Sequence, residues 1–326
     1  METEFTRPDR KQRLAQLGYL FKHSFTIVGR ERAILSPIIR MVIYAMVMVL
    51  LFFIGIYLAA GEGGGSTWFL LAGSLMFIYK FFYYNRAELT LSRMIYETAI
   101  GNTPEGPAVR REIADLKAQI RILGALDMVS AWVESRKNKA GGLMTLLLGG
   151  IVQIWDLVNN FLLPVFAIEK VGIRDGLAQM KRLKDHVPET LAGVFGINIL
   201  GGVVGTLMAP FHGGGIIIGI GAGLLLGERM PAAFSGGELH EWFAAMPELG
   251  PIGPETVFNW LPLFVVVFLG FLLHGLLGRV VTALKVIYFT LFYIRIAHPE
   301  RLTADLRADL EGYLEMQEQG MEAVPA

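Results

Sequence analysis

The amino-acid sequence predicts an all-α fold: a polytopic helical membrane bundle with re-entrant or half-spanning segments and cytoplasmic amphipathic helices. Three observations lead to this prediction. Hydrophobic residues make up 53% of the 326 residues and charged residues only 18%, whereas a soluble domain carries about 25% charged residues. Met41–Ala60 contains twenty consecutive residues without a charge, which suffice for one helix across about 30 Å of hydrocarbon. The basic residues are concentrated in alternate segments of the chain, as the positive-inside rule expects.

The composition also excludes several classes of protein. The chain has no cysteine, which rules out a disulfide scaffold and Cys-ligated zinc or iron–sulfur sites. Lys and Arg total 29 and so do Asp and Glu, so the net charge gives no sign of a nucleic-acid partner. The motifs GxSxG, Walker A and HExxH are missing. We therefore predict that the protein is not an enzyme, holds no cofactor or metal, and has membrane lipids as a partner.

The polar, basic residues 1–40 form the first region of the chain. Within it, residues 12–28 carry apolar side chains at helical spacing, which predicts an interfacial amphipathic helix: Leu14, Leu17, Phe21, Phe25 and Val28. A helical transmembrane domain follows over residues 41–298, and an acidic cytoplasmic helix over 299–326. The transmembrane domain contains a cytoplasmic helical insert at 86–140, interrupted at "GNTPEG", and an outer loop at 228–256.

Between these landmarks the hydropathy predicts four firm crossings and up to six. Met41–Ala60 and Thr67–Tyr84 form a hairpin through the short link "GEGGGS", and Lys80 near the end of the second span can snorkel to the headgroups. Thr190–Gly227 is either one span plus a half-helix or two short spans. Val257–Gly278 is uncharged. If the run from Val257 to Ala297 is one helix, it exceeds the bilayer, and its aromatic end must pack on cytoplasmic helices.

The distribution of Lys and Arg predicts the orientation of these spans. The basic residues lie almost entirely in four segments: 1–40 with eight, 80–140 with ten, 169–188 with five and 279–326 with five. The segment 61–66 has none and 227–256 has one. By the positive-inside rule both termini are cytoplasmic, in a bacterial-type inner membrane.

One segment conflicts with this orientation. Gly142–Ile168 is long enough to cross, but Lys139 and Lys170 on its two sides both appear in cytoplasmic segments. We favour a re-entrant or interfacial segment. The alternative pairs it with residues 118–134 as a hairpin, but Arg121 and Asp127 make that segment a poor span because charges at mid-bilayer are costly.

Glycine recurs every fourth residue in the third apolar stretch. Gly215, Gly219, Gly223 and Gly227 form this series, and Gly201 and Gly205 repeat the spacing upstream. Glycine at this spacing gives a smooth helix face that another backbone can approach closely. The series predicts helix packing, either between subunits of a homo-oligomer or within one subunit.

A polar stripe and a histidine are the candidate polar path. Gln153, Asp156 and Asn160 share one face of an apolar helix, with Asn159 beside them. His274 lies in the last long span and could relay protons or pair with Asp156. The alternatives are interhelical hydrogen bonds that fix packing and, for the stripe, a shallow segment that faces water.

These features predict a homo-oligomeric channel or transporter-like protein for a small solute or ion. The rival is a non-conducting scaffold or accessory subunit that recruits a cytoplasmic protein partner or organises lipid. An intramembrane enzyme ranks third.

Four stretches of the sequence occur in a familiar order: "YYNRAELTLSRMIYETAIGNTPEG", "RILGALDMVSAWVE", "IWDLVNNFLLPVFAIEKVGIRDGLAQMKRL" and "FTLFYIRIAHP". In this order, with Trp155, Pro164 and Glu169 ahead of a short amphipathic helix, the chain resembles a prokaryotic family of multi-pass membrane proteins of unknown function. The resemblance covers about residues 38–298 and implies a bundle with paired spans, but no activity. The chain departs from it at Asp127 and Lys139, where an uninterrupted apolar span is expected.

Overall fold

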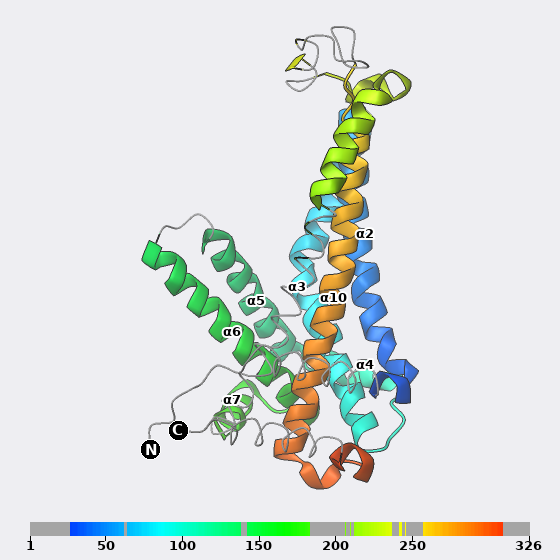
Figure 1. Ribbon diagram of the computed structural model, residues 1–326. Coiled ribbons are helices and arrows are strands. Elements are labelled where there is room, and N and C mark those ends of the chain that lie inside the picture. The colour runs from blue at the N-terminus through cyan, green and yellow to red at the C-terminus, as the bar shows by residue number, and fades with distance from the viewer. Residues whose placement is uncertain are drawn as a thin grey trace, which may run out of the picture. The chain divides into compact units, whose positions relative to one another are not determined.

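The structure is a computed structural model that describes residues 27–61, 64–137, 142–182, 212–236 and 257–308, together with the single residues 206, 209, 241, 242 and 245. Every regular element in these ranges is a helix, and Ser235 and Asn259 form one isolated β-bridge. The all-α prediction is therefore confirmed. The longer helices (Figure 1) are α2 (Leu35–Ala60), α3 (Ser66–Ala99), α4 (Gly106–Ala114), α5 (Lys117–Lys137), α6 (Gly142–Glu169), α7 (Ile173–Arg182) and α10 (Leu261–Ala297). A further helix is described from His212 to Leu225.

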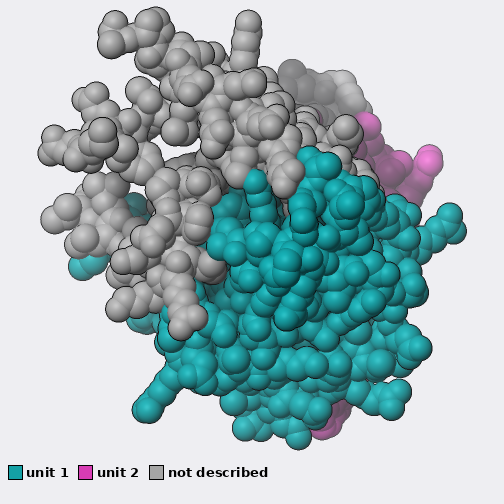
Figure 2. All heavy atoms as spheres, turned by 90° about the horizontal axis from the view of Figure 1, so that it is seen from below, with its two compact units in different colours: residues 1–41, 81–200, 280–326 teal, residues 42–80, 201–279 magenta. Residues whose placement is uncertain are grey.

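The chain divides into two compact units, coloured in Figure 2. Unit 1 contains residues 1–41, 81–200 and 280–326, and unit 2 contains residues 42–80 and 201–279. The predicted insert 86–140 and tail 299–326 fall in unit 1, and the predicted outer loop 228–256 falls in unit 2. The helices α2, α3 and α10 contribute residues to both units.

In unit 2, α2 and the first part of α3 form the predicted antiparallel hairpin. Its turn includes Gly65, whose φ of 94° is a conformation that favours glycine. A Cβ atom at Gly55 would lie 2.7 Å from the side chain of Leu70, so the two helices approach too closely for a larger residue there. About three turns of α2 nearer the N-terminus of the chain, the Tyr44 hydroxyl donates to the Met76 carbonyl over 2.8 Å.

The glycine series packs on α10 within unit 2. Cβ atoms at Gly215 and Gly219 would lie 2.7 Å from Val266 Cγ1 and from Leu263 Cα. At Gly223 the added atom would lie 2.5 Å from the Asn259 carbonyl oxygen, and at Gly227 it would collide with the Val257 carbonyl. As the residue numbers of the glycines increase, those of the residues that they contact decrease. The glycine segment therefore runs antiparallel to the start of α10, as Figure 1 shows for the helix from His212. We call this contact the glycine seam.

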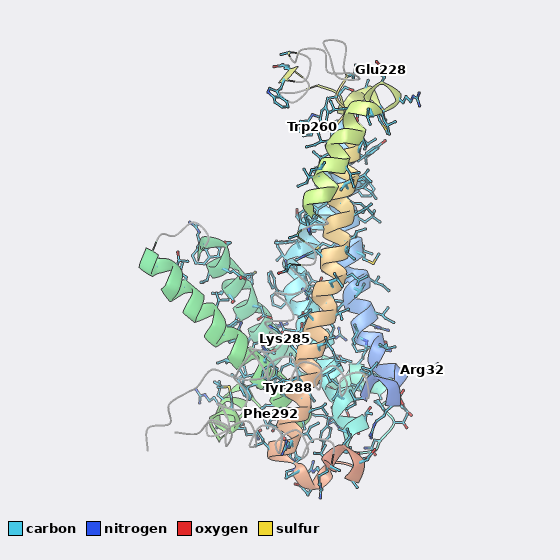
Figure 3. All side chains as sticks on the ribbon, in the orientation of Figure 1. Arg32, Glu228, Trp260, Lys285, Tyr288 and Phe292 are labelled. Atoms are coloured by element: carbon cyan, nitrogen blue, oxygen red, sulfur yellow. The ribbon has the colours of Figure 1, made fainter. Side chains whose placement is uncertain are left out.

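Asn259 secures the end of the glycine seam. It is fully buried, and its side-chain oxygen accepts from the Leu261 amide over 3.0 Å, so that it caps the start of α10. Its side-chain amide donates to the Pro231 carbonyl and to Ser235 Oγ. Trp260, which follows it, donates to the Gly236 carbonyl over 2.8 Å. Figure 3 shows Trp260 and Glu228 at the same end of unit 2.

Unit 1 has an extensive apolar core. Residues 161–168 of α6 are buried without interruption, which requires neighbours on every side of the helix. Phe161 packs edge-on against Phe289 of α10, with 5.5 Å between ring centroids. Residues of α3 complete the core, among them Leu91 and Ile95. The aromatic end of α10 is therefore packed on other helices, as the length of the 257–297 run predicts, and Figure 3 shows Tyr288 and Phe292 along this part.

One alternative for Gly142–Ile168 is wrong. A re-entrant segment must reverse direction, but α6 is one continuous helix over Gly142–Glu169, even with Pro164 inside it. The interfacial alternative stays a prediction. Helix α6 packs against α5 (Figure 1), which is the pairing that the hairpin alternative expects. The predicted span Thr67–Tyr84 lies within α3, which continues to Ala99. Its later residues Leu89, Leu91 and Ile95 pack in the unit 1 core.

Several other predicted features lie wholly or partly outside the described residues. The helix predicted over 12–28 is described only at its last two residues, and the amphipathic helix predicted over 172–187 is present as α7 up to Arg182. The region 190–211 is described only at residues 206 and 209, so the choice between one and two crossings there is not tested.

The described part of the acidic tail packs on unit 1. Leu302 and Leu306 are buried, and the Thr303 amide donates to the Ala99 carbonyl over 3.1 Å. Asp305 lies 2.5 Å from Arg30, and the Thr303 side chain together with this ion pair lowers the pKa of the Asp305 carboxyl to about 2.

Alanine at Gly223 should destabilise unit 2. The added methyl group meets a backbone carbonyl that cannot rotate away, so we expect a loss on the order of 2 kcal/mol in unfolding free energy. The measurement is thermal unfolding in detergent, followed by tryptophan fluorescence. Gly221→Ala is the matched control, because Gly221 has open space around it, and alanine is the better helix former by roughly 1 kcal/mol. Equal melting of both variants would contradict the glycine seam.

Acid should release the tail. Because the folded-state pKa of Asp305 lies below its ordinary value of 3.8, its contribution is complete above pH 4 and is lost as the pH falls towards 2. The protection factors of the amides of residues 303–308 against hydrogen exchange should therefore fall over this interval. Asp305→Asn should show the faster exchange already at neutral pH, and an unchanged exchange rate in this variant would show that the ion pair does not hold the tail.

Candidate functional site

Two histidines meet in unit 2. His274 lies on α10, and His212 lies on the helix that packs against it, with 6.4 Å between the ring centroids at an interplanar angle of 75°. Gly270, one turn before His274, makes room for the second ring: a Cβ there would lie 3.5 Å from His212 Cδ2 and Nε2. Both histidines are exposed in the single chain. The glycine seam thus supplies the second imidazole that the sequence pattern of α10 alone lacks.

The surroundings of the histidine pair are apolar. Phe271 and Leu273 flank His274 on α10 and are themselves exposed, as are Ile216 and Ile217 beyond His212. Each imidazole carries two ring nitrogens that can form hydrogen bonds. The structure therefore brings two imidazole side chains from different helices together on an apolar surface of unit 2. In the part of the chain that the structure describes, no group of three or more His, Asp or Glu residues is placed to hold a metal ion.

The polar stripe is only partly described. The side chains of Gln153 and Asp156 lie outside the described part, although their backbone belongs to α6. Asn159 donates its side-chain amide to Asp127 Oδ1 over 3.2 Å, and Trp155 Nε1 donates to the same oxygen over 2.9 Å. Asn160 is half-buried. The described member of the stripe that contacts Asp127 therefore has a packing role between α5 and α6.

Asp127 is the centre of this polar network. Its second oxygen, Oδ2, accepts from the buried Asn85 of α3 over 2.5 Å, so one carboxylate joins α3, α5 and α6. Three N–H donors satisfy the charge inside unit 1. Asp127 counts against a buried or membrane-inserted helix when α5 is considered by itself, and the structure removes that objection by pairing it internally.

The described members of the glycine series contact residues of the same chain. Gly215, Gly219, Gly223 and Gly227 face α10 and the residues just before it, so the intramolecular alternative accounts for them. Gly201 and Gly205 lie outside the described residues.

A second polar cluster in unit 1 is not among the predicted sites. Glu169, at the end of α6, accepts from the Tyr293 hydroxyl over 2.8 Å and lies 2.5 Å from His298 Nε2. Tyr96 packs edge-on against His298 and accepts from Arg301 over 2.8 Å. The signal in the sequence is the order of Glu169 and "YIRIAHP", but no spacing rule connects residues more than a hundred positions apart. The cluster joins the ends of α6 and α10.

Comparison with known proteins adds nothing to this geometry: no protein-family model, no curated protein and no solved structure matches the chain. The resemblance to a family of multi-pass membrane proteins stays a prediction.

Removal of the Asp127 carboxylate should destabilise unit 1. Asp127→Ala leaves the buried amide of Asn85 without this partner, which should lower the unfolding free energy by about 2–3 kcal/mol. Hydrogen exchange of α3, α5 and α6 gives the measurement, because it reports each helix separately. Glu134→Ala, which removes an exposed carboxylate from the same helix, is the control. Equal protection in the two variants would mean that the network contributes no stability.

Proposed function

We propose that the protein is an integral protein of a bacterial-type inner membrane that transports a small ion or solute, in a homo-oligomer with both termini cytoplasmic. Two described helices support membrane insertion by length and composition: Arg32–Ala60 and Leu261–Ala297, with mean hydropathies of 2.6 and 2.3. In a soluble protein such helices belong to the core. Here only 17% and 0% of their most apolar windows are buried, which suits helices that are covered by lipid.

The histidine pair is the observation that supports transport. An ionisable side chain in an apolar helix is a functional-site hypothesis by default, and two from different helices face one another at 6.4 Å. His212 and His274 bring two imidazole rings from different helices together in an otherwise apolar environment. The proposed role of this pair is to carry the ion or proton through the membrane-inserted part.

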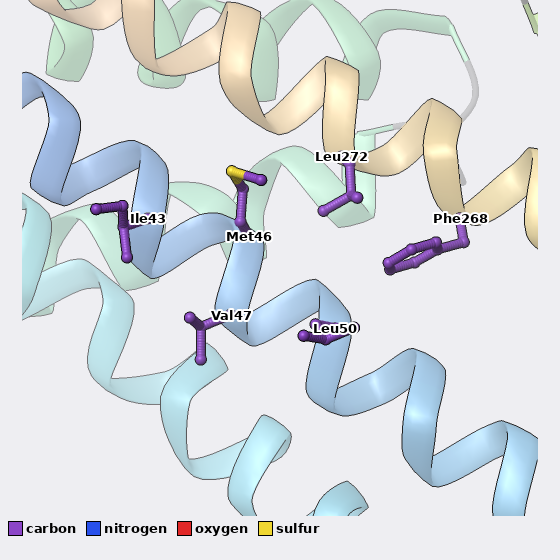
Figure 4. Close-up of a pocket in the computed structure, with 6 residues that line it drawn as sticks. All are labelled: Ile43, Met46, Val47, Leu50, Phe268 and Leu272. Carbon is purple, nitrogen blue, oxygen red and sulfur yellow. The ribbon is translucent and has the colours of Figure 1, made fainter.

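One observation favours the non-conducting alternative. An open groove of about 270 Å³ lies between α2 and α10 in unit 2, and all of its lining side chains are apolar (Figure 4): Ile43, Met46, Val47, Leu50, Phe268 and Leu272. A groove of this composition suits a lipid acyl chain. A protein that organises lipid needs such a surface, whereas transport does not.

Flux through reconstituted protein tests the proposal. The full chain is placed in liposomes that contain a pH-sensitive dye, and proton entry and K⁺-driven flux are followed after an imposed gradient. We expect flux above that of empty liposomes, and a loss of about tenfold or more in His212→Gln and in His274→Gln, because glutamine keeps a polar side chain but cannot exchange a proton near neutral pH.

Leu273→Gln is the matched control. It places the same amide one residue away on α10, on an exposed position, and should leave the flux unchanged. Wild-type liposomes that contain verified protein and stay impermeable to protons, K⁺ and other small ions and solutes would contradict transport and favour the lipid-organising alternative.

A further inference from the structure

Three arginines of unit 1 lie on helices that contact one another. Tyr83 joins α3 to α2, and the ion pair of Arg93 with Glu112 joins α3 to α4. Arg40 lies on α2, Arg86 on α3 and Arg110 on α4. The Tyr83 hydroxyl is 3.5 Å from the Arg40 carbonyl, which holds α2 against α3 at this level, and Arg86 follows Tyr83 by one helical turn. Partial burial and the nearby guanidinium groups of Arg40 and Arg86 lower the pKa of Arg110. Its guanidinium folds back over α4, where a Cβ at Gly106 would lie 3.3 Å from Nη1.

No carboxylate neutralises these three charges among the described residues. Some of the other basic residues of unit 1 have acidic partners at 2.5–3.2 Å: Arg30 pairs with Asp305, Arg93 with Glu97 and Glu112, and Lys170 with Glu112. None of the ion pairs within the described ranges includes Arg40, Arg86 or Arg110. Like charges that repel one another without a counter-ion favour an anion from outside the chain.

The positions of Arg40 and Arg86 in the sequence indicate which anion lies near them. Arg40 directly precedes the uncharged run Met41–Ala60, and Arg86 lies two residues after Tyr84, where the predicted span in α3 ends. If these runs lie in the hydrocarbon, the arginines lie at its cytoplasmic boundary, where lipid phosphates are concentrated.

We propose that Arg40, Arg86 and Arg110 bind the phosphate of an anionic lipid headgroup. The planar guanidinium group donates two parallel hydrogen bonds to phosphate oxygens, which a flexible ammonium group does less well. A phosphate held by three helices relieves their mutual repulsion and fixes the ends of α2, α3 and α4 to one another. This inference rests on the membrane insertion in the proposed function, and it does not depend on transport.

Binding of a short-chain lipid to the full chain in neutral detergent tests the inference. The probe is dioctanoylphosphatidylglycerol, and native mass spectrometry measures its affinity. We expect each of Arg40→Gln, Arg86→Gln and Arg110→Gln to weaken binding about fivefold, the factor that corresponds to one basic residue near an anionic surface. Arg111→Gln is the matched control: Arg111 is exposed, adjacent to Arg110, and its Nε already donates to the Pro107 carbonyl.

Four results would overturn the inference: equal affinity for dioctanoylphosphatidylcholine, full competition by inorganic phosphate at equal concentration, unchanged affinity in all three variants, or a loss in Arg111→Gln as large as theirs. Should a variant fail to fold, the wild type still decides, because binding through these charges must weaken between 50 mM and 500 mM salt. Impermeable liposomes together with selective phosphatidylglycerol binding would remove only the transport proposal.

Discussion

The close approach of two backbones at the glycine seam is the constraint on which the candidate site depends. Side chains normally hold packed helices 8–10 Å apart, but Gly219 and Gly223 bring one helix against Leu263 and Asn259 with no side chain between them. This contact fixes the antiparallel register as well as the distance. In that register His212 lies over Gly270 and next to His274, so the separation of the two imidazoles is set by backbone contacts and not by flexible side chains.

Unit 1 solves the packing problem differently. Its helices are joined by polar side chains whose partners come from other helices, as at Asp127, which accepts from Asn85 and Trp155, and at Glu169, which accepts from Tyr293. Such networks cost desolvation, and at Asp127 the side-chain oxygens of its donors Asn85 and Asn159 are buried without a hydrogen-bond partner among the described residues. In return they are specific, because a helix rotated by one residue would leave donors and acceptors unpaired. Unit 2 uses small residues for close contact, and unit 1 uses hydrogen bonds for orientation.

The sequence predicts the helices of this fold better than their partners. Hydropathy and length locate α2 and the 257–297 helix within a few residues, because an apolar run of twenty residues has few alternatives to a helix. The end of α3 at Ala99 is not predictable in this way, since the core that extends it comes from distant α6 and α10. For the same reason Asp127 is misjudged: its cost in an isolated helix is visible in the sequence, but its donors lie 28, 32 and 42 residues away.

The same limit applies to the candidate site. The glycine spacing indicates a close contact but is identical for a partner in the same chain and in a second copy, and only the positions of Val266 and Leu263 decide between them at the described residues. His274 by itself suggests little, because a lone histidine in a helix is easily satisfied by a hydrogen bond. Its significance comes from His212, which stands 62 residues earlier beside three consecutive glycines. A periodic glycine face can pack on a neighbouring helix in several registers. Here the hydrogen bonds of Asn259, which caps the start of α10 and donates its backbone amide to the Gly223 carbonyl, set the register of the glycine seam. That register places the two histidines next to one another.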